Sequence, residues 1–222
     1  EFAGGYTDVF ETGVFRGVHH CDVRSLYPSL MLKDRLKPAT DELDAFLHLL
    51  DFLRSFRIDA KQRMRKAAGG EDSVYWDALQ STFKILINSF YGYLGFQQGR
   101  FSDFSAAERV AAEGRALLRK MIDWLKKHGA RPIEIDTDGI YFVPPGFKNE
   151  KEKEAFQEAF RDSLPKGVEI EFDGEYTSMF SYKMKNYALL EKNGEIIIKG
   201  AALKSRGLEP FQRDFLRDIL RL

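Results

Sequence analysis

Apolar residues at helical spacing fill the middle of the chain. Residues 41–68 carry them at intervals of three or four, at Leu43, Phe46, Leu47, Leu50 and Leu53. The pattern ends at Gly69 and Gly70, and a second helical segment follows over about 72–91. Because the connecting turn is so short, the two segments predict an antiparallel helical hairpin.

Three more segments have the spacing of amphipathic helices. Residues 105–128 predict a long helix that begins with a capping box of Ser105 and Glu108. The charged stretch after Lys148 predicts another helix, and residues 208–222 predict a last one.

The two-residue period of strands marks most of the remaining chain. Residues 13–23 predict a strand that leads into a helix start near Pro28. Residues 132–143 contain two apolar runs around Asp-Thr-Asp-Gly, which is typical of a tight β-hairpin. Further strands are predicted near 168–180, 182–190 and 195–199. Together with the helices, these segments predict an α+β fold with an antiparallel sheet.

The composition of the chain says more about where the protein works than about which reaction it catalyses. The 222 residues contain 34 Lys and Arg against 34 Asp and Glu, so any nucleic-acid-binding surface has to be local. A single cysteine, Cys21, excludes an internal disulfide framework, and no apolar run is long enough to cross a bilayer. We therefore expect an intracellular, cytoplasmic protein with no membrane contact, nucleoid-associated in a prokaryote. Glu1 in place of an initiator Met is consistent with a piece of a longer chain.

Three acids stand where carboxylates from separate segments can converge. Asp22 ends the first predicted strand, and Asp136 and Asp138 lie in the predicted hairpin turn. Each alone is typical of a strand end or a turn. Carboxylates that converge in this way can bind divalent ions, and hard oxygen donors favour Mg²⁺ over zinc. The neighbouring histidines, His19 and His20, point to opposite faces of a strand, so they are expected to pack or to lie at the surface rather than to share an ion.

Three longer motifs, in this order, carry more information than the acids alone. They are Asp22-Val-Arg-Ser-Leu-Tyr-Pro-Ser, Lys84-Ile-Leu-Ile-Asn-Ser-Phe-Tyr-Gly and Asp136-Thr-Asp-Gly. The sequence resembles family B DNA polymerases, whose motifs D-x-x-S-L-Y-P-S, K-x-x-x-N-S-x-Y-G and D-T-D-S/G these segments match. The segment Tyr182-Lys-Met-Lys-Asn-Tyr-Ala is similar to a fourth family motif, K-K-x-Y-A, in degenerate form. The resemblance runs from about Gly5 to about Gly200.

The resemblance implies a DNA-directed DNA polymerase that adds deoxynucleotides to a primer 3′-hydroxyl by two-metal phosphoryl transfer. Asp22 and Asp138 would be the essential ligands of two Mg²⁺ ions, with Mn²⁺ as an alternative. The backbone carbonyl of Val23 would join them, and Asp136 would be an accessory carboxylate.

The resemblance also implies a binding site for the incoming nucleotide. Ser25, Leu26 and Tyr27 come just before a predicted helix start, where free N–H groups suit phosphate oxygens. Tyr27 corresponds to the family's tyrosine that leaves no room for a 2′-hydroxyl. The predicted hairpin supplies further phosphate-binding residues, namely Arg57, Lys61, Lys84 and Asn88. On each helix the two residues are four positions apart, so they share a helix face.

The same resemblance assigns four residues to DNA, namely Tyr91, Gly92, Lys185 and Tyr187. The first two lie where the family contacts the nascent base pair and the template, and the last two lie where it contacts the primer strand. Met184 and Asn186 stand where the family motif has basic residues, which weakens the predicted grip on the primer.

These assignments predict a palm built on the antiparallel sheet, with a helical-hairpin fingers insertion. The palm would comprise residues 1–38 and 100–207, and the fingers residues 39–99. Residues 208–222 would begin a truncated thumb or form a C-terminal helix. Thumb and exonuclease domains would be absent, so the partners would include flanking domains of a longer chain as well as primer–template DNA and dNTPs. The sequence leaves the oligomeric state open.

Two other interpretations stay open. A catalytically silent, polymerase-like module that binds nucleic acid or protein would explain the residues at Met184 and Asn186. Against this interpretation, a module freed from catalysis has no physical need to keep Asp22, Asp138 and Tyr27 together. Reverse transcription by a similar palm is the second, although the Ser-Leu-Tyr-Pro-Ser context and the Tyr-Gly motif favour family B.

Overall fold

The computed structural model describes residues 4–67 and 70–200, together with positions 209, 211, 214 and 218. The chain divides into two compact units. Unit 1 comprises Glu1–Gly4, Ser25–Gly114 and Lys166–Val168, and unit 2 comprises Gly5–Arg24, Arg115–Pro165 and Glu169–Leu222. The helix predicted for residues 208–222 lies outside the described residues except at those four positions.

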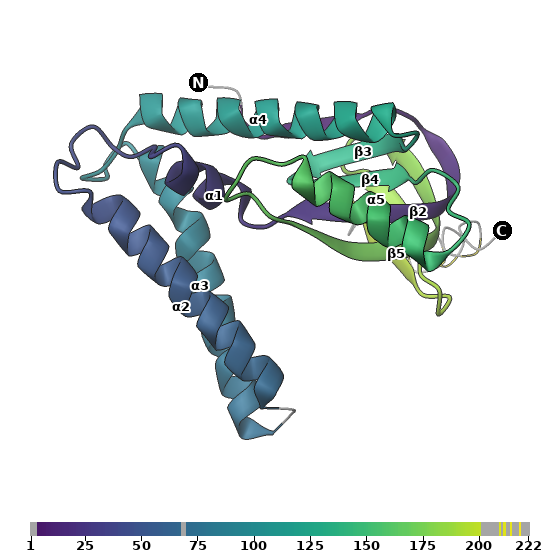
Figure 1. Cartoon of the computed structure of the whole chain (residues 1–222), viewed down its shortest axis with the longest axis horizontal. Coiled ribbons are helices and arrows are strands. Elements are labelled where there is room, and N and C mark those ends of the chain that lie inside the picture. The colour runs from purple at the N-terminus through teal and green to yellow at the C-terminus, as the bar shows by residue number, and fades with distance from the viewer. Residues whose placement is uncertain are drawn as a thin grey trace. The chain divides into compact units, whose positions relative to one another are not determined.

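Unit 1 is helical and contains the predicted hairpin. Its helices are α1 (Leu26–Lys33), α2 (Ala45–Lys66), α3 (Glu71–Leu94) and the first part of α4 (Phe104–Lys127). Helices α2 and α3 lie side by side and antiparallel (Figure 1), which confirms the predicted hairpin. The core of unit 1 is a buried cluster of Met31, Leu36, Phe46, Leu47, Leu50, Leu53, Ile87, Phe90, Leu94, Ala106, Ala107 and Val110.

Two aspartates decide where helices of unit 1 begin. Asp41, which is 3% exposed, accepts hydrogen bonds from the N–H groups of Ala45 at 3.0 Å and Phe46 at 2.9 Å. Helix α2 therefore begins later than the apolar pattern indicates. At α4, Asp103 directly precedes the helix and accepts a hydrogen bond from the N–H of Ala106 at 2.9 Å. Ser105 already lies inside the helix, so the predicted capping box of Ser105 and Glu108 is wrong. Each carboxylate satisfies N–H groups that have no partner within the first helical turn.

Within the described residues, unit 2 contains a seven-stranded antiparallel sheet in the order β1-β3-β4-β2-β5-β6-β7. The strands are β1 (Tyr6–Val9), β2 (Gly13–Val23), β3 (Arg131–Thr137), β4 (Gly139–Val143), β5 (Ile170–Lys183), β6 (Asn186–Leu190) and β7 (Ile196–Lys199). Sequence periodicity missed only β1, a short edge strand that pairs with β3. The hairpin predicted around Asp-Thr-Asp-Gly is the β3–β4 pair, and the mixed architecture confirms the predicted α+β class.

Helix α5 (Glu150–Asp162) and the second part of α4 pack together against the sheet. Trp124 of α4 stacks on Phe160 of α5 with ring centroids 4.6 Å apart, and Phe156 of α5 contacts Phe142 of β4. Tyr141, which points to the opposite side of β4, joins a second buried cluster with Phe15, Val18, Ile133, Met179, Tyr187 and Leu189. Apolar burial therefore holds β4 from both faces. No helix in the described ranges is long and apolar enough to cross a membrane.

Leu49 and Leu50 are neighbours on α2 in contrasting environments, and they give a matched test of the hairpin core. Leu50 is 0% exposed, whereas Leu49 is 52% exposed. Leu50→Ala should lower the free energy of unfolding by about 2–5 kcal/mol because it leaves a cavity, and Leu49→Ala should lower it by less than about 1 kcal/mol. Urea denaturation followed by circular dichroism measures both values. Equal losses would contradict the packing of α2 against α3.

Candidate active site

The strand end at Asp22 and the turn of the β3–β4 hairpin lie next to each other in unit 2. In the β2–β4 pair, Asp22 is opposite Gly139, the residue that follows Asp138. The N–H of Val23 donates a hydrogen bond to the carbonyl of Asp138 at 3.0 Å. Backbone pairing thus joins two carboxylate-bearing segments that are far apart in the sequence.

The turn that carries Asp138 has an unusual backbone. Asp136 and Gly139 pair across it, and the N–H of Asp138 donates to the carbonyl of Asp136 at 2.9 Å. Thr137, between them, has a φ of 69°. A β-branched residue at positive φ is uncommon and costs conformational energy, and such residues concentrate at functional sites. The tight turn therefore fixes the backbone position of Asp138.

The acids of unit 2 fit a hard divalent cation better than a soft transition metal. Asp22, Asp136 and Asp138 are all half-buried and offer oxygen donors, which Mg²⁺ and Mn²⁺ prefer. Among the described residues, no group of three or more His, Cys, Asp or Glu side chains is arranged to hold a metal ion. The donors that could hold a metal ion at this place are the carboxylates of Asp22, Asp136 and Asp138 and the backbone carbonyl of Val23.

Asp136 is held by a cation from another part of the sheet. Its Oδ1 lies 3.2 Å from Nζ of Lys185, which has a φ of 60° in the tight turn between β5 and β6. The N–H of Lys185 donates to a carboxylate oxygen of Glu134 at 2.7 Å. Glu134 is 0% exposed, and burial raises its pKa to about 7, although the hydrogen bond from Lys185 opposes this shift. Glu134 thus fixes the backbone of Lys185, and Asp136 meets its ammonium group.

Tyr187 of β6 lies in the sheet core. Its side chain is 3% exposed, and its hydroxyl oxygen lies 3.2 Å from the hydroxyl oxygen of Tyr141. Burial raises the pKa of Tyr187 to about 12. The contact of Tyr187 with the primer strand stays a prediction.

In unit 1, residues predicted to bind nucleotide and DNA pack against each other. The rings of Tyr27 on α1 and Tyr91 on α3 stack with centroids 4.2 Å apart and 23° between their planes. A guanidinium N–H of Arg57 on α2 donates to Oγ of Ser25 at 3.4 Å. Leu26, between Ser25 and Tyr27, is buried at 3% exposure.

The remaining phosphate-binding candidates lie on the two helices of the hairpin. Lys61 follows Arg57 along α2 at the spacing of one helical turn and is half-buried. Lys84 and Asn88 are exposed on α3, as is Gly92, which follows Asn88 one turn later. The predicted spacing on each helix is therefore realised in regular α-helix.

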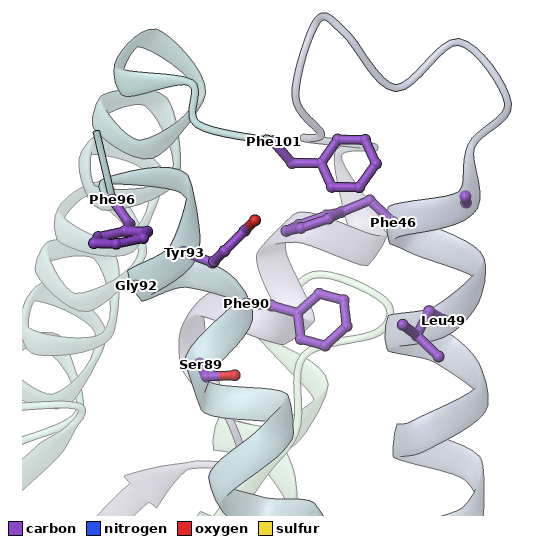
Figure 2. Close-up of a pocket in the computed structure, with 9 residues that line it drawn as sticks. Phe46, Leu49, Ser89, Phe90, Gly92, Tyr93, Phe96 and Phe101 are labelled. Carbon is purple, nitrogen blue, oxygen red and sulfur yellow. The ribbon is translucent and has the colours of Figure 1, made fainter. Parts of the chain in front are cut away.

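An apolar pocket of about 560 Å³ opens between α2, α3 and the residues that follow α3. Figure 2 shows Phe46 and Leu49 from α2 near Phe90 and Tyr93 from α3. Gly92, predicted to contact the template, is part of the same lining. Sequence reasoning did not find this pocket, because the spacing of its apolar residues is that of ordinary helical core positions.

Comparison with known proteins decides the family. The sequence model described as DNA polymerase family B matches residues 45–222, which is most of the chain. The chain belongs to DNA polymerase family B. This result confirms the resemblance that the motifs carry. The first motif, at Asp22, precedes the matched residues.

Archaeal family B relatives are similar to nearly the whole chain. DNA polymerase 1 of Pyrococcus abyssi (strain GE5 / Orsay) is 32% identical over 238 residues, which cover 96% of this chain and 30% of the relative. The DNA polymerase of Archaeoglobus fulgidus is 28% identical over 251 residues, which cover 100% of this chain and 32% of the relative. The chain spans about 30% of the length of the first of these relatives.

A solved family B structure has a similar fold. The family B DNA polymerase from Pyrobaculum calidifontis aligns with 99% of this chain and 34% of its own, with a TM-score of 0.70 and 19% sequence identity. At this identity the likeness concerns the fold alone.

Two hydrogen bonds beside the acids of this family B chain escaped sequence reasoning. Glu134 is the partner of Lys185, and its one sequence signal was a charged residue inside an apolar strand. His20 on β2 donates from Nδ1 to a carboxylate oxygen of Asp173 on β5 at 2.6 Å, which lowers the pKa of Asp173. The sequence places His19 and His20 next to Asp22, but nothing in it indicates Asp173 as a partner.

Substitution of Glu134 tests the anchoring of the β5–β6 turn. Glu134→Ala should lower the free energy of unfolding by about 1–3 kcal/mol, because the N–H of Lys185 loses its acceptor. Glu134→Gln keeps an amide oxygen at nearly the same position and should cost less than the alanine variant. Urea denaturation at pH 8 measures both. Equal effects of the two variants would show that the hydrogen bond contributes little.

Proposed function

We propose that this chain is the palm and fingers core of a DNA-directed DNA polymerase, which adds dNTPs to the 3′-hydroxyl of a primer on template DNA. The palm comprises residues 1–38 and 100–207, and the fingers residues 39–99. The observation that carries the proposal is the pairing of the Asp22 strand end with the Asp138 turn in a chain that belongs to DNA polymerase family B.

Four residues of unit 2 are proposed to hold two Mg²⁺ ions. Asp22 and Asp138 supply the essential carboxylates, Val23 supplies its carbonyl oxygen, and Asp136 is accessory. Bound there, Mg²⁺ would lower the pKa of the primer 3′-hydroxyl and neutralise charge on the leaving pyrophosphate. The ion pair with Lys185 supports an accessory role for Asp136, because an exposed cation already partly neutralises its carboxylate.

Residues of unit 1 are proposed to bind the triphosphate of the incoming nucleotide. On the hairpin these residues are Arg57, Lys61, Lys84 and Asn88. A guanidinium fork and ammonium groups together suit phosphate oxygens better than either alone. The start of α1 adds the backbone N–H groups of Ser25, Leu26 and Tyr27, because the first N–H groups of a helix have no helical acceptor. The hydrogen bond from Arg57 to Ser25 supports a shared role for these two segments.

Tyr27 is proposed to exclude ribonucleotides. Its ring can act as a steric barrier only if it does not yield, and the stack on Tyr91 limits its rotation. Tyr91 and Gly92 are proposed to contact the nascent base pair and the template. Lys185 and Tyr187 are proposed to contact the primer strand.

A catalytically silent binding module is the second candidate function. Two observations favour it over a polymerase with a strong primer grip. The ammonium of Lys185 is 3.2 Å from Asp136, and Tyr187 is buried at 3% exposure. A wild-type protein that binds primer–template DNA in a gel-shift assay but incorporates no nucleotide would establish this candidate.

Loss of either essential carboxylate should abolish synthesis. Asp22→Ala and Asp138→Ala should each reduce single-nucleotide incorporation with Mg²⁺ by at least about a thousandfold, because both carboxylates are needed to hold the ions. Primer extension by the native chain with any flanking domains measures this loss. The control is Asp123→Ala, which removes an exposed acid of α4 and should leave the rate unchanged. A retained rate in either active-site variant, with its fold intact by circular dichroism, would refute the metal assignment.

The ring of Tyr27 should decide sugar selectivity. Tyr27→Ala should raise the efficiency of ribonucleotide incorporation relative to deoxynucleotide by at least about tenfold, because the space for a 2′-hydroxyl opens. Tyr27→Phe keeps the ring and should retain the selectivity of the wild type. Single-turnover kinetics with matched dNTP and rNTP give the ratio. Unchanged selectivity in the alanine variant would exclude the steric role.

A further inference from the structure

His20 connects the two strands that flank β2 near the candidate metal site. Its Nδ1 donates to Oδ1 of Asp173 on β5 at 2.6 Å. On the other side, its ring lies against the ring of Tyr141 on β4, with centroids 4.3 Å apart and 31° between the planes. The side chain of His20 is 14% exposed. A hydrogen bond and a ring contact thus hold the imidazole in one orientation.

A β-bulge aims Asp173 at His20. In the β2–β5 pair, His20 is opposite Gly174 and Asp22 is opposite Glu171, so β5 has one more residue than β2 over this stretch. Such an extra residue bends a strand and redirects side chains, and it often lies next to an active site. Asp173 sits within this irregular stretch.

The held imidazole fills the space beside Gly139. A Cβ atom built on Gly139 would lie far inside van der Waals contact of Nε2 of His20, 3.0 Å from Cε1 and 3.5 Å from Cδ2. A clash with the end of a side chain is cheap where that side chain can swing away. Here His20 cannot swing away without breaking its hydrogen bond to Asp173 and its contact with Tyr141.

Gly139 is also the residue through which the two candidate metal-binding segments pair. It follows Asp138 directly and lies opposite Asp22 on β2 and opposite Asp136 on β3. A side chain at this position that meets a fixed imidazole therefore pushes on the backbone that carries Asp138.

We propose that His20, held by Asp173, is a positioning residue that fixes the Asp138 turn against β2 and restricts position 139 to glycine. The catalytic part of this inference rests on the proposed polymerase function. The steric part concerns the sheet alone and is testable without any activity.

A double-mutant cycle between His20 and Gly139 tests the proposal. With His20 present, Gly139→Ala should lower kcat for dNTP incorporation by at least about tenfold while KM for dNTP changes by less than about threefold, because the carboxylate geometry serves chemistry. In the His20→Ala background, the same Gly139→Ala change should lower kcat by less than about twofold, because the space is then empty. Equal effects in both backgrounds, or no effect of Gly139→Ala beside His20, would overturn the proposal.

Two further variants separate a held histidine from a merely adjacent one. Asp173→Ala releases the imidazole, so the kcat loss caused by Gly139→Ala should become several-fold smaller than in the presence of Asp173. A loss of unchanged size would exclude Asp173 as the anchor. The matched control is Gly146→Ala, which places a Cβ where no heavy atom lies within 4 Å and should leave kcat unchanged.

The melting temperatures of the same proteins keep the two hypotheses distinguishable. Gly139→Ala should lower the melting temperature in the wild-type background and should lower it much less in the His20→Ala background. If the wild-type protein incorporates no nucleotide, the proposed function fails and the catalytic role of His20 fails with it. The steric part then stands or falls on whether the temperature losses depend on His20.

Discussion

The antiparallel pairing of β2 with β4 is the interaction on which the candidate active site depends. It sets Asp22 opposite Gly139, and the N–H of Val23 donates a hydrogen bond to the carbonyl of Asp138. Register in a sheet has a period of two, so a slip by one residue would turn Asp22 to the other face. The buried residues of β2 make such a slip costly, because Val18, which packs in the cluster with Tyr141, would also turn to the other face. The core of the sheet therefore fixes the geometry of the carboxylates.

The same alternation explains why adjacent histidines have different surroundings. His19 lies near Phe142 and Phe147, and burial lowers its pKa. His20 points to the opposite side of β2, the side of Tyr141, and bonds to Asp173. The side that carries Asp22 is the side of His20, because residues two apart on a strand share a face. One histidine serves packing, and the other lies beside the acids.

The sequence predicted the helices and strands that have a local signal. It missed the contacts that depend on how distant strands are aligned with each other. Helical spacing located α2 and α3, and the motif order led to the family. The cap at Asp41 was missed because its N–H partners come after a loop whose course apolar spacing does not describe. Glu134 and Asp173 were missed for a stronger reason. Each meets a residue on a distant segment, and the bulge that aims Asp173 has no sequence signature of its own.

Lys185 makes a backbone hydrogen bond and an ion pair, and the loss of each would cost a different amount of free energy. Its N–H meets the fully buried Glu134, and a buried acceptor that loses its donor carries a desolvation penalty. Its ammonium meets Asp136 where both side chains are partly exposed, and ion pairs of this kind contribute little. The ammonium can therefore exchange Asp136 for another anion while the backbone of the turn stays in place. If Lys185 contacts the primer strand as proposed, Met184 and Asn186 reduce the number of cations there, but the anchored Lys185 stays able to bind a phosphate.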